Sequence, residues 1–504
     1  MGRIAAAFRL IGVFWVLVRA DALIPRELQP ALPPSARVFA RLLRLLSGRA
    51  GRQGRPGERL AHALERLGPV AIKLGQLLST RGDVFGAAFA SDLARLKDQL
   101  PPFDAAIARA EVEAAIDRPI EAWLSEFGPA VAAASLAQAH RARLLDGREV
   151  AIKVLRPGIE RRVFRDERAL SLAARLANRW PIARRLEPVA FAATISRALE
   201  LELDLRMEAG AADELREAMH GEGYMRAPAV IWEGVARRVI TLEWARGVAL
   251  SDDAAIGATG VDRAAAADAL VRGFLTQALD HGVFHADLHE GNLFLAPPAE
   301  LTAVDFGIVG RLGIAERRYL AEILWGFLRR DYERLAAVHF EAGYVPRRHD
   351  QGAFAQALRA VGEPVFGRPA SEVSMGRVLG QLFDITALFD MRLRPELVLL
   401  QKTMVTVEGV ARRLDPDHDL WRAAEPVVKR WIARELSPAA TARRLVAEAR
   451  EVGKAIVDLV EAQRSLAHQP KPEARTRASL EAWLAFALGA LSAAVAFALA
   501  AWRG

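Results

Sequence analysis

The sequence predicts an α+β fold, mostly helical and built in two lobes, with an N-terminal helical extension and a C-terminal transmembrane helix. Helical periodicity covers most of the 504 residues, while strand patterns are confined to residues 129–155, 239–244 and 293–304. Residues 483–502 form a stretch without a charged side chain near the end of the chain. These three observations separate a small β-containing lobe from a larger helical one and place a candidate membrane span after both.

Composition sets the broad class of protein. Hydrophobic residues make up 52% and charged residues 26%, which is typical of a globular chain. The net charge of +8 favours an anionic partner, whether nucleotide, acidic lipid or nucleic acid, and does not choose among them. The chain has no Cys, which excludes disulfides, thiolate metal sites and a Cys nucleophile. The apolar run at 11–18 is short and lacks a small-residue cleavage site, so we expect no cleaved signal peptide.

The first 58 residues are basic and apolar. The run from Phe8 to Val18 is too short to span a bilayer. Between Ala36 and Leu46, arginines recur at helical spacing among Val, Phe and Leu, at Arg37, Arg41 and Arg44. This pattern is typical of an interfacial helix and equally of a surface helix that packs its apolar side on the body, and both interpretations stay open. Residues 48–57, rich in Gly and Arg, read as a linker.

Helical periodicity continues from Arg59 to Leu100 with a break at Gly68-Pro69. Lys73 and Gln76 are three positions apart and project from one helix face. Gly75 between them would let another backbone or a phosphate approach closely. By itself, the pattern is most typical of a solvated helix face.

The period changes to that of strands after Pro129. Two apolar runs flank Asp146-Gly147, a strong hairpin signal, and the second run carries Val-Ala-Ile-Lys ending at Lys153. In protein kinases the Lys of this pattern pairs with nucleotide phosphates and with a helix Glu. Where a kinase has a glycine-rich loop, this chain has Ala132, Ala133, Ala134 and Ser135. Their Cβ atoms restrict the backbone, so nucleotide binding stays the prediction while phosphoryl transfer to a protein is disfavoured.

Two further segments complete the small lobe. Residues 200–208 are acidic among apolar residues, and the simple reading is a solvated face with charge pairs. A buried Lys153 needs a partner, however, so we expect one Glu of this segment to be its counter-ion. Residues 239–244 predict a strand, which in a kinase would meet the adenine, and residues 262–284 predict a helix leading to the next motif.

The stretch from His285 to Gly307 organises the large lobe. Two apolar strands joined through Pro297-Pro298 would bring Asp287, Asn292 and Asp305 to one end of a hairpin. Such oxygens are hard ligands suited to Mg²⁺ that also binds phosphates. The order H-x-D-x-x-x-x-N followed by D-F-G matches the catalytic loop and metal-binding motif of protein kinases, so the expected fold is protein-kinase-like. No A-P-E and no long activation segment follow, which weakens a docking platform for protein substrates.

The tail carries the candidate span. Trp483 to Trp502 has suitable length, aromatic ends and basic flanks, and the alternative is a buried C-terminal helix. Basic residues precede the stretch at Lys471, Arg475 and Arg477, and only Arg503 follows it. By the positive-inside rule, the catalytic body then lies on the cytoplasmic side of the membrane. We therefore expect a single-pass C-terminal anchor in a bacterial-type inner membrane.

Together these residues resemble the UbiB family of atypical protein-kinase-like proteins, over roughly residues 60–420. The matching motifs are K-x-G-Q at Lys73, Gly75 and Gln76, the Ala-rich loop at 132–135 continuing into Ala137-Gln138, the kinase Lys at Lys153, E-x-D at Glu202 and Asp204, the helix Glu at Glu208, and the catalytic and metal residues at Asp287, Asn292 and Asp305. In the family the catalytic loop usually reads H-A-D-P-H-P-G-N, and here Leu288 and Glu290 replace both prolines. The ligand spacing is kept, so metal binding should survive, while the rigidity of the loop is in question.

The resemblance implies a division of the chain and a set of roles. The expected parts are a basic segment (1–58), a helical extension (59–128), a small lobe (129–250), a large lobe (251–466), a linker (467–482) and a transmembrane helix (483–502). Asp287 and Lys153 would be catalytic, residues 132–135 with Lys153 and Glu208 would bind nucleotide, and Asn292 and Asp305 would bind metal. Lys73 and Gln76 would lie over the phosphates, with Glu202 and Asp204 holding the extension in place.

The implied activity is that of an ATP- and Mg-dependent kinase-like ATPase supporting ubiquinone biosynthesis. Its expected partners are membrane lipids, polyprenyl-phenol or quinone intermediates and other quinone-biosynthesis enzymes, with no nucleic acid. Some family members carry the label 2-polyprenylphenol 6-hydroxylase, but this sequence has no dinucleotide fingerprint and no persuasive iron set. Two alternatives stay open: a true protein kinase regulating quinone-biosynthesis enzymes, and a catalytically silent scaffold that binds nucleotide and lipid.

Overall fold

The computed structural model describes most of the chain up to residue 435. The described ranges are 2–23, 34–47, 54–79, 101–179, 187–364, 388–391 and 395–435, with single positions at 89, 92, 93, 96, 184, 381 and 385. Among these residues no helix combines the length and the apolar character needed to cross a membrane. The predicted span at 483–502 lies outside the described residues, as do the linker before it and most of the segment from 365 to 394.

Within the described residues, four helices precede the kinase-like part: α1 (Gly2–Arg19), α2 (Pro34–Leu45), α3 (Pro56–Leu67) and α4 (Pro69–Ser79). The predicted break falls between α3 and α4, where Gly68 has a φ of 102°. Helix α1 packs against α8 (Ile159–Ala177), which follows the first three strands in sequence. Arg9 of α1 binds both carboxylate oxygens of Asp166 in α8 at 2.7 and 3.0 Å and donates to the Leu67 carbonyl at 2.9 Å.

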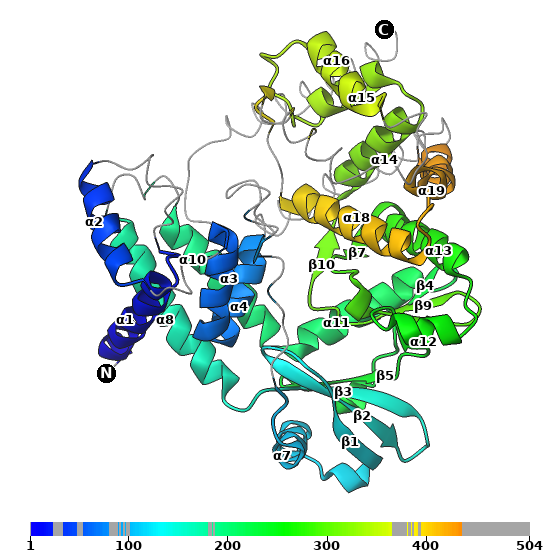
Figure 1. Ribbon diagram of the computed structural model, residues 1–504. Helices are drawn as coiled ribbons and strands as arrows, with labels where there is room; N and C mark the ends of the chain where they lie inside the picture. The colour runs from blue at the N-terminus through cyan, green and yellow to red at the C-terminus, as the bar shows by residue number, and fades with distance from the viewer. Residues whose placement is uncertain are drawn as a thin grey trace, which may run out of the picture. The chain divides into compact units, whose positions relative to one another are not determined.

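The first sheet has four antiparallel strands in the order β1-β2-β3-β5 (Figure 1). They are β1 (Leu124–Ala133), β2 (Ala137–Leu144), β3 (Glu149–Leu155) and β5 (Val239–Glu243). The hairpin expected around Asp146-Gly147 is confirmed, and Gly147 takes a φ of 90° that suits glycine.

Helix α7 (Ala105–Ile116) packs on this sheet through a shared core. Ala108 and Val112 of α7 contact the buried side chains of Trp123, Val150 and other sheet residues. A division of the chain between residues 128 and 129 would cut through this core. Helix α7 and the start of β1 therefore belong with the sheet and not with the extension.

Two helices that the structure describes follow α8 before the second part of the fold: α10 (Pro188–Glu202) and α11 (Leu205–Met219). Only Leu203 and Asp204 separate them. Asp204 caps α11, since its side chain accepts a hydrogen bond from the Arg206 backbone N–H. The acidic segment predicted from the sequence thus spans the junction between two helices.

The second part contains short strands and helices. Strands β4 (Met225–Arg226), β9 (Glu300–Ala303), β8 (Leu293–Ala296) and β6 (Val248–Ala249) form one sheet in that order, and β7 (Val283–His285) pairs with β10 (Val309–Arg311). The hairpin predicted from the apolar runs before and after Pro297-Pro298 is confirmed as β8 and β9. Helices α12 (Asp253–Ala258) and α13 (Arg263–Thr276) precede β7, with one π-helical turn at Gln277–His281.

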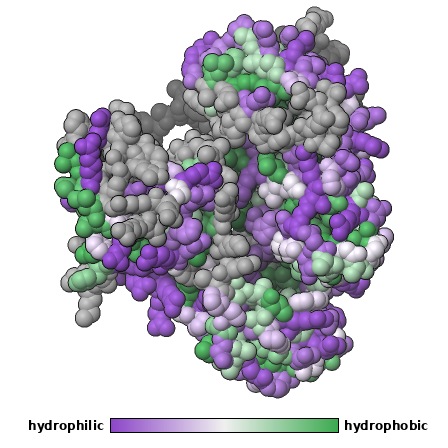
Figure 2. Space-filling view, in the orientation of Figure 1, coloured by the Kyte–Doolittle hydropathy of each residue, from purple (hydrophilic) through white to green (hydrophobic). Residues whose placement is uncertain are grey.

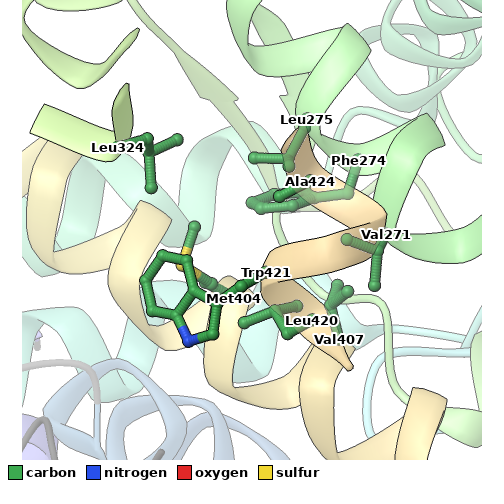
Figure 3. A pocket seen from close by; sticks show the side chains of 9 residues that line it. All are labelled: Val271, Phe274, Leu275, Leu324, Met404, Val407, Leu420, Trp421 and Ala424. Carbon is green, nitrogen blue, oxygen red and sulfur yellow. The ribbon is translucent and has the colours of Figure 1, made fainter. Parts of the chain in front are cut away.

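The remaining described helices are α14 (Ile314–Leu328), α15 (Tyr332–Glu341), α16 (Gln351–Gly362), α18 (Pro395–Leu414) and α19 (Leu420–Glu435). Helix α14 begins soon after Gly307, which leaves no long segment behind the D-F-G motif, as predicted. Apolar side chains of α13, α14, α18 and α19 surround a small recess (Figure 3). Trp431 of α19 donates its indole N–H to the Leu279 carbonyl at 2.8 Å and so fixes α19 to the end of α13.

Candidate functional site

Lys153 is the centre of an ion cluster that joins three elements. It lies in β3, where its neighbours across the ladders are Ala139 of β2 and Ile240 of β5. Its Nζ lies 2.8 and 3.0 Å from the two carboxylate oxygens of Glu208 in α11, and 3.1 Å from Oδ1 of Asp305. The structure therefore pairs Lys153 with the Glu that the sequence suggested and also with the Asp of D-F-G.

The electrostatics of this cluster keep a cation between two carboxylates. Burial raises the pKa of Glu208, and the charge of Lys153 opposes that rise. Burial disfavours the charged form of Lys153, but the charges of Asp305 and Glu208 outweigh it and raise its pKa. The charge of Lys153 holds the pKa of Asp305 well below its usual range. Asp305 is therefore ionised at neutral pH and half-exposed, as a cation ligand needs to be.

A second lysine lies beside the same aspartate. Lys73 of α4 forms an ion pair of 2.9 Å with Oε2 of Glu202, the last residue of α10. Both side chains are mostly buried, at 14% and 18% exposure. Burial raises the pKa of Glu202 against the opposing charge of Lys73, and Lys73 also helps to lower the pKa of Asp305. The extension thus contributes one cation to the surroundings of Asp305, and Glu202 holds it there.

Two expectations about the extension differ from what the structure shows, and a third stays untested. Asp204 caps the start of α11 and binds Arg206 of its own helix at 2.6 Å, whereas Glu202 forms the ion pair with Lys73. Gly75 accommodates Leu64 and Leu96, since a Cβ atom there would lie 2.7 and 2.2 Å from their methyl groups, and so it serves packing instead of a close phosphate approach. Gln76 accepts a hydrogen bond from the Ser79 hydroxyl through its backbone carbonyl at 2.6 Å, and its role toward phosphates stays a prediction.

The Ala-rich loop is shorter than the sequence suggested. Ala132 and Ala133 belong to β1 and pair with Ala139 and Gln138 of β2, so the turn begins at Ala134. The Ala134 N–H donates to the Ala137 carbonyl at 2.8 Å, and Ser135 is fully buried. The small Ala side chains allow the pairing of β1 with β2 to continue at positions where a glycine-rich loop would leave the sheet.

Two residues that the sequence reading did not single out for a role fix this turn to the chain before α7. Arg156 donates to the Ala134 carbonyl at 2.9 Å and to the Pro101 carbonyl at 3.0 Å. The side-chain amide of Gln138 binds the backbone of Phe103 twice, accepting at 2.8 Å and donating at 3.2 Å. We call these contacts the turn clamp. Two signals in the sequence could have identified these residues. Arg156 is a charged residue directly after a buried strand, and Gln138 is a polar residue within a strand.

Backbone contacts hold the catalytic loop in one arrangement. The fully buried ring of His285 accepts the Asp287 N–H at Nδ1, at 3.1 Å, and donates from Nε2 to the Val304 carbonyl at 3.0 Å. Burial lowers the pKa of His285, which keeps the ring in this neutral form. Asn292 donates its side-chain amide to the Asp287 carbonyl at 3.0 Å, and its backbone carbonyl accepts the Val304 N–H at 2.9 Å. Asp287, Asn292 and the strand end before Asp305 are thereby tied together.

The two residues that replace the family prolines are themselves fixed. Leu288 is completely buried, and Glu290 forms an ion pair with Arg413 of α18. Thr403, also in α18, donates its hydroxyl to the Ala286 carbonyl at 3.0 Å. Side-chain contacts from α18 therefore restrain the loop at positions where proline would restrain it through the backbone.

The donor set fits a magnesium ion shared with phosphates. Within the described ranges, no group of three or more His, Cys, Asp or Glu side chains gathers as a metal site. The amide nitrogen of Asn292 is engaged, which leaves its oxygen as a ligand, and Asp305 is ionised. Asp305 also takes a φ of 64°, a left-handed conformation found mostly in Gly, Asn and Asp. Two hard protein ligands completed by water and phosphate is the usual pattern for Mg²⁺ bound with a nucleotide.

Comparison with known proteins assigns the fold and the family. Residues 95–339 match the ABC1 atypical kinase-like domain, and residues 358–419 match the UbiB helical domain. A protein of Tolumonas auensis named "Probable protein kinase UbiB" is 39% identical over 442 residues, which cover 86% of this chain and 81% of the relative. A protein of the same name from Marinobacter nauticus is 38% identical and covers 87% of this chain and 80% of the relative. This chain belongs to the UbiB family.

A solved structure supports the fold of this UbiB-family chain independently. The Mycobacterium tuberculosis protein Rv3197, solved in complex with erythromycin, superposes with a TM-score of 0.52 over 78% of this chain and 98% of its own. At 22% sequence identity that likeness shows the fold alone. The predicted kinase-like, mostly helical fold with strands is confirmed, and the UbiB helical domain is the region that contains α18.

Proposed function

We propose that this chain is an ATP-binding, Mg-dependent kinase-like ATPase that supports ubiquinone biosynthesis at a membrane. The observation that carries the proposal is the cluster of Lys153, Glu208 and Asp305, in which a charged Lys lies between a buried Glu and an ionised, half-exposed Asp. A nucleotide with Mg²⁺ would match this arrangement, because its phosphates pair with the Lys and its metal with the Asp. The family assignment supports the link to ubiquinone.

Each site residue has a role in this proposal. Lys153, oriented by Glu208, would pair with phosphate oxygens, and Asp305 with Asn292 would hold Mg²⁺, which neutralises phosphate charge when bound. Asp287 is one-third exposed and fixed through its backbone, so it would orient the group that accepts the phosphoryl. The turn from Ala134 to Ser135 would face the nucleotide with a carbonyl already held by Arg156.

The acceptor of the phosphoryl group is the open part of the reaction. Helix α14 begins soon after Asp305, which leaves little chain to form a docking platform for a protein, and the charge of Lys73 helps to lower the pKa of the same aspartate. Both features favour water or a small lipid-linked phenol as acceptor. The second candidate is a protein kinase acting on quinone-biosynthesis enzymes, which the printed name of the relatives favours.

The direct test of the metal role is Asp305→Asn. Loss of the coordinating charge should weaken Mg-dependent ATP binding by at least about tenfold and abolish hydrolysis. Asp331→Asn is a matched control, because Asp331 caps α15 and Asn caps helices equally well. An unchanged Mg²⁺ titration of ATP binding in Asp305→Asn would overturn the assignment.

A second assay distinguishes the three functional hypotheses: ATPase, protein kinase and silent scaffold. ATP hydrolysis is measured with and without vesicles and polyprenyl-phenol analogues, and transfer of labelled phosphate to quinone-biosynthesis enzymes is followed in parallel. Hydrolysis stimulated by the phenol supports the ATPase proposal, and protein labelling supports the kinase. Nucleotide binding with neither activity would support a silent scaffold.

The proposed location is the bacterial-type inner membrane, with residues 483–502 as a single-pass anchor and the catalytic body in the cytoplasm. The support is the uncharged length of this stretch, its Trp ends and the basic residues before it. Quinone precursors with polyprenyl tails partition into bilayers, so an anchored enzyme would meet them there. Full-length protein should resist alkaline carbonate extraction, whereas a chain lacking residues 480–504 should not. Extraction of the full-length protein would show that the stretch does not span the membrane.

A further inference from the structure

We propose that the exposed sides of α1 and α2 form a docking surface for an anionic lipid bilayer, separate from the predicted C-terminal anchor. This N-terminal face consists of the apolar side chains Phe8, Ile11, Phe14, Trp15, Val38, Leu42 and Leu45 with the basic side chains Arg19, Arg37 and Arg41. The proposal does not depend on the ATPase reaction, since none of these residues belongs to the site around Asp305.

Large apolar side chains are concentrated on this face. Of the 21 large hydrophobic residues that are exposed in the described part of the chain, nine lie between residues 8 and 46. Their exposure reaches 70% at Phe8 and 77% at Leu45. Single exposed hydrophobic residues are normal, but a cluster of this kind marks an interaction surface. Figure 2 shows green apolar residues beside purple hydrophilic ones over these helices, at the left edge of the molecule.

Helix α1 is held with its apolar side outward. Arg9 fastens the opposite side of the helix to Asp166 and to the Leu67 carbonyl. Phe8, Ile11 and Trp15 follow at helical spacing along the free side and are 70%, 63% and 43% exposed. The packing of α1 on α8 fixes which side of the helix faces outward, and so it fixes the exposure of these three side chains.

Helix α2 combines an apolar stripe with a basic one. Val38, Leu42 and Leu45 lie four and three positions apart and are all more than half exposed. Arg37 and Arg41 lie one helical turn apart beside them, and both are exposed. This is the pattern of a helix in the plane of a membrane surface. Of the two interpretations left open by the sequence, the exposure of Val38, Leu42 and Leu45 favours the interfacial helix.

Charge selects an anionic lipid surface as the occupant. Residues 1–57 contain ten arginines, no Lys and two carboxylates, Asp21 and Glu27. Asp21 is buried beside Arg59 and so adds no negative charge to the face. The Arg19 guanidinium lies over the Trp15 ring at 5.3 Å, a pairing suited to the boundary between headgroups and acyl chains. Each basic residue near an anionic membrane favours binding by about a factor of five.

The absence of Cys allows a direct test on the full chain. A single Cys at Leu42→Cys carries an environment-sensitive dye, and Leu145→Cys, in the tight turn between β2 and β3 and 62% exposed, is the control. The labelled proteins are placed in nanodiscs of phosphatidylcholine alone or with phosphatidylglycerol. We expect the dye at 42, but not at 145, to be quenched by lipid-borne nitroxide, and only with phosphatidylglycerol. Equal quenching at the two positions would overturn the proposal.

Charge variants separate this surface from the anchor. Arg37→Gln with Arg41→Gln should shift the docked population of the dye at 42 by about tenfold or more, while the protein stays in the disc. Arg329→Gln with Arg347→Gln removes the same charge from exposed positions elsewhere and should change nothing. If the dye at 42 is shielded from aqueous iodide in both lipids without contact with lipid nitroxide, a protein surface covers this face. That surface would be the C-terminal segment or a second copy, and the proposal would be wrong.

Discussion

Two Lys–Glu pairs lie beside Asp305, and they belong to different regions of the molecule. Lys153 and Glu208 come from the kinase-like body and lie 2.8 Å apart. Lys73 and Glu202 join the N-terminal extension to the end of α10 and lie 2.9 Å apart. The chemistry is the same in both pairs, but the backbone that carries the lysine differs. Lys153 lies in a strand paired on both sides, whereas Lys73 lies in a helix of the extension.

This difference predicts that the site has a fixed part and a part that can withdraw. Moving Lys153 would require breaking the ladders of β3 with β2 and β5, so its position is set with the fold itself. Lys73 is held near Asp305 by its ion pair with Glu202 and by the packing of α4. The body therefore supplies a lysine whose position is set with the fold, and the extension supplies a cation that the ion pair with Glu202 helps to hold.

The largest expected effect comes from Lys153→Met. Glu208 is only 8% exposed and would lose its buried partner, at a cost of about 3 kcal/mol in the free energy of unfolding. A drop of roughly 6 °C in Tm should follow, measured by thermal unfolding, together with at least tenfold weaker ATP binding. Lys73→Met leaves Glu202 without its partner, but Glu202 is 18% exposed against 8% for Glu208, so the cost should be smaller, about 2 kcal/mol.

The double variant Lys153→Met with Glu208→Gln controls for the stability effect. A neutral side chain at 208 removes the unpaired charge, so part of the lost Tm should return while ATP binding stays weak. If Lys153→Met and Lys73→Met lower the Tm equally, the distinction between a fixed and a removable pair is wrong.

The sequence predicted the fixed region well because its signals are local. Alternating apolar residues around Asp146-Gly147 marked a hairpin, and the apolar runs around Pro297-Pro298 marked another. The Val-Ala-Ile-Lys pattern predicted a buried Lys, which in turn required a Glu in the acidic segment. Each inference needed only neighbouring residues and the cost of burying a charge.

A second prediction concerns the catalytic loop of the body. Arg413→Ala removes the partner of Glu290 and should let the loop that carries Asp287 move. A small displacement of a positioned group costs rate rather than affinity, so kcat for ATP hydrolysis should fall roughly tenfold with the Kd for Mg-ATP unchanged. Steady-state kinetics and nucleotide titration measure the two quantities separately.

Restoring the family residue provides the matched test. Glu290 is the first residue of a 3₁₀ turn, a position that accepts proline, and within the described contacts its N–H donates no hydrogen bond. Adding Glu290→Pro to Arg413→Ala should therefore recover most of the lost kcat. No recovery would show that the ion pair does something other than stiffen the loop.

Contacts between distant segments are the part that the sequence did not predict. Thr403 and Ala286 are 117 positions apart, and neither the hydroxyl nor the carbonyl leaves a periodic signature. The role of Glu202 came from family resemblance, and the same resemblance wrongly extended it to Asp204, which caps its own helix. The Gly75 prediction failed for a similar reason, since the packing of Leu64 and Leu96 becomes visible only in three dimensions.

A third prediction tests whether the extension can withdraw. Glu202→Gln weakens the hold on Lys73 by about 1 kcal/mol, so the open arrangement should be populated about fivefold more. Amide exchange in α4 should rise by that factor, and ATP should associate faster by a similar one. Glu200→Gln, two positions earlier and exposed, is the control. If amide exchange in α4 is unchanged, the ion pair is not what holds the extension.

The smallest expected effect concerns the turn clamp, where the two regions meet. Arg156 donates to the Ala134 carbonyl at 2.9 Å and to the Pro101 carbonyl at 3.0 Å, so it joins the nucleotide-side turn to the chain that leaves the extension. Lysine keeps the charge but lacks the guanidinium fork, so Arg156→Lys should retain one of these hydrogen bonds at most. The loss of one hydrogen bond corresponds to about 0.5–1.5 kcal/mol in the free energy of unfolding.

The clamp should affect binding more than the chemical step. A looser turn would raise the KM for ATP about threefold with kcat unchanged, because no group around Asp287 moves. Arg148→Lys is the matched control, since Arg148 pairs only with Asp146 in the turn between β2 and β3 among the described contacts. Gln138→Glu would disturb the second half of the clamp, because a carboxylate cannot donate to the Phe103 carbonyl. Similar KM increases in Arg156→Lys and Gln138→Glu would show that the turn and the extension are coupled through these contacts. A fall in kcat alone would instead show that these contacts act on the catalytic loop.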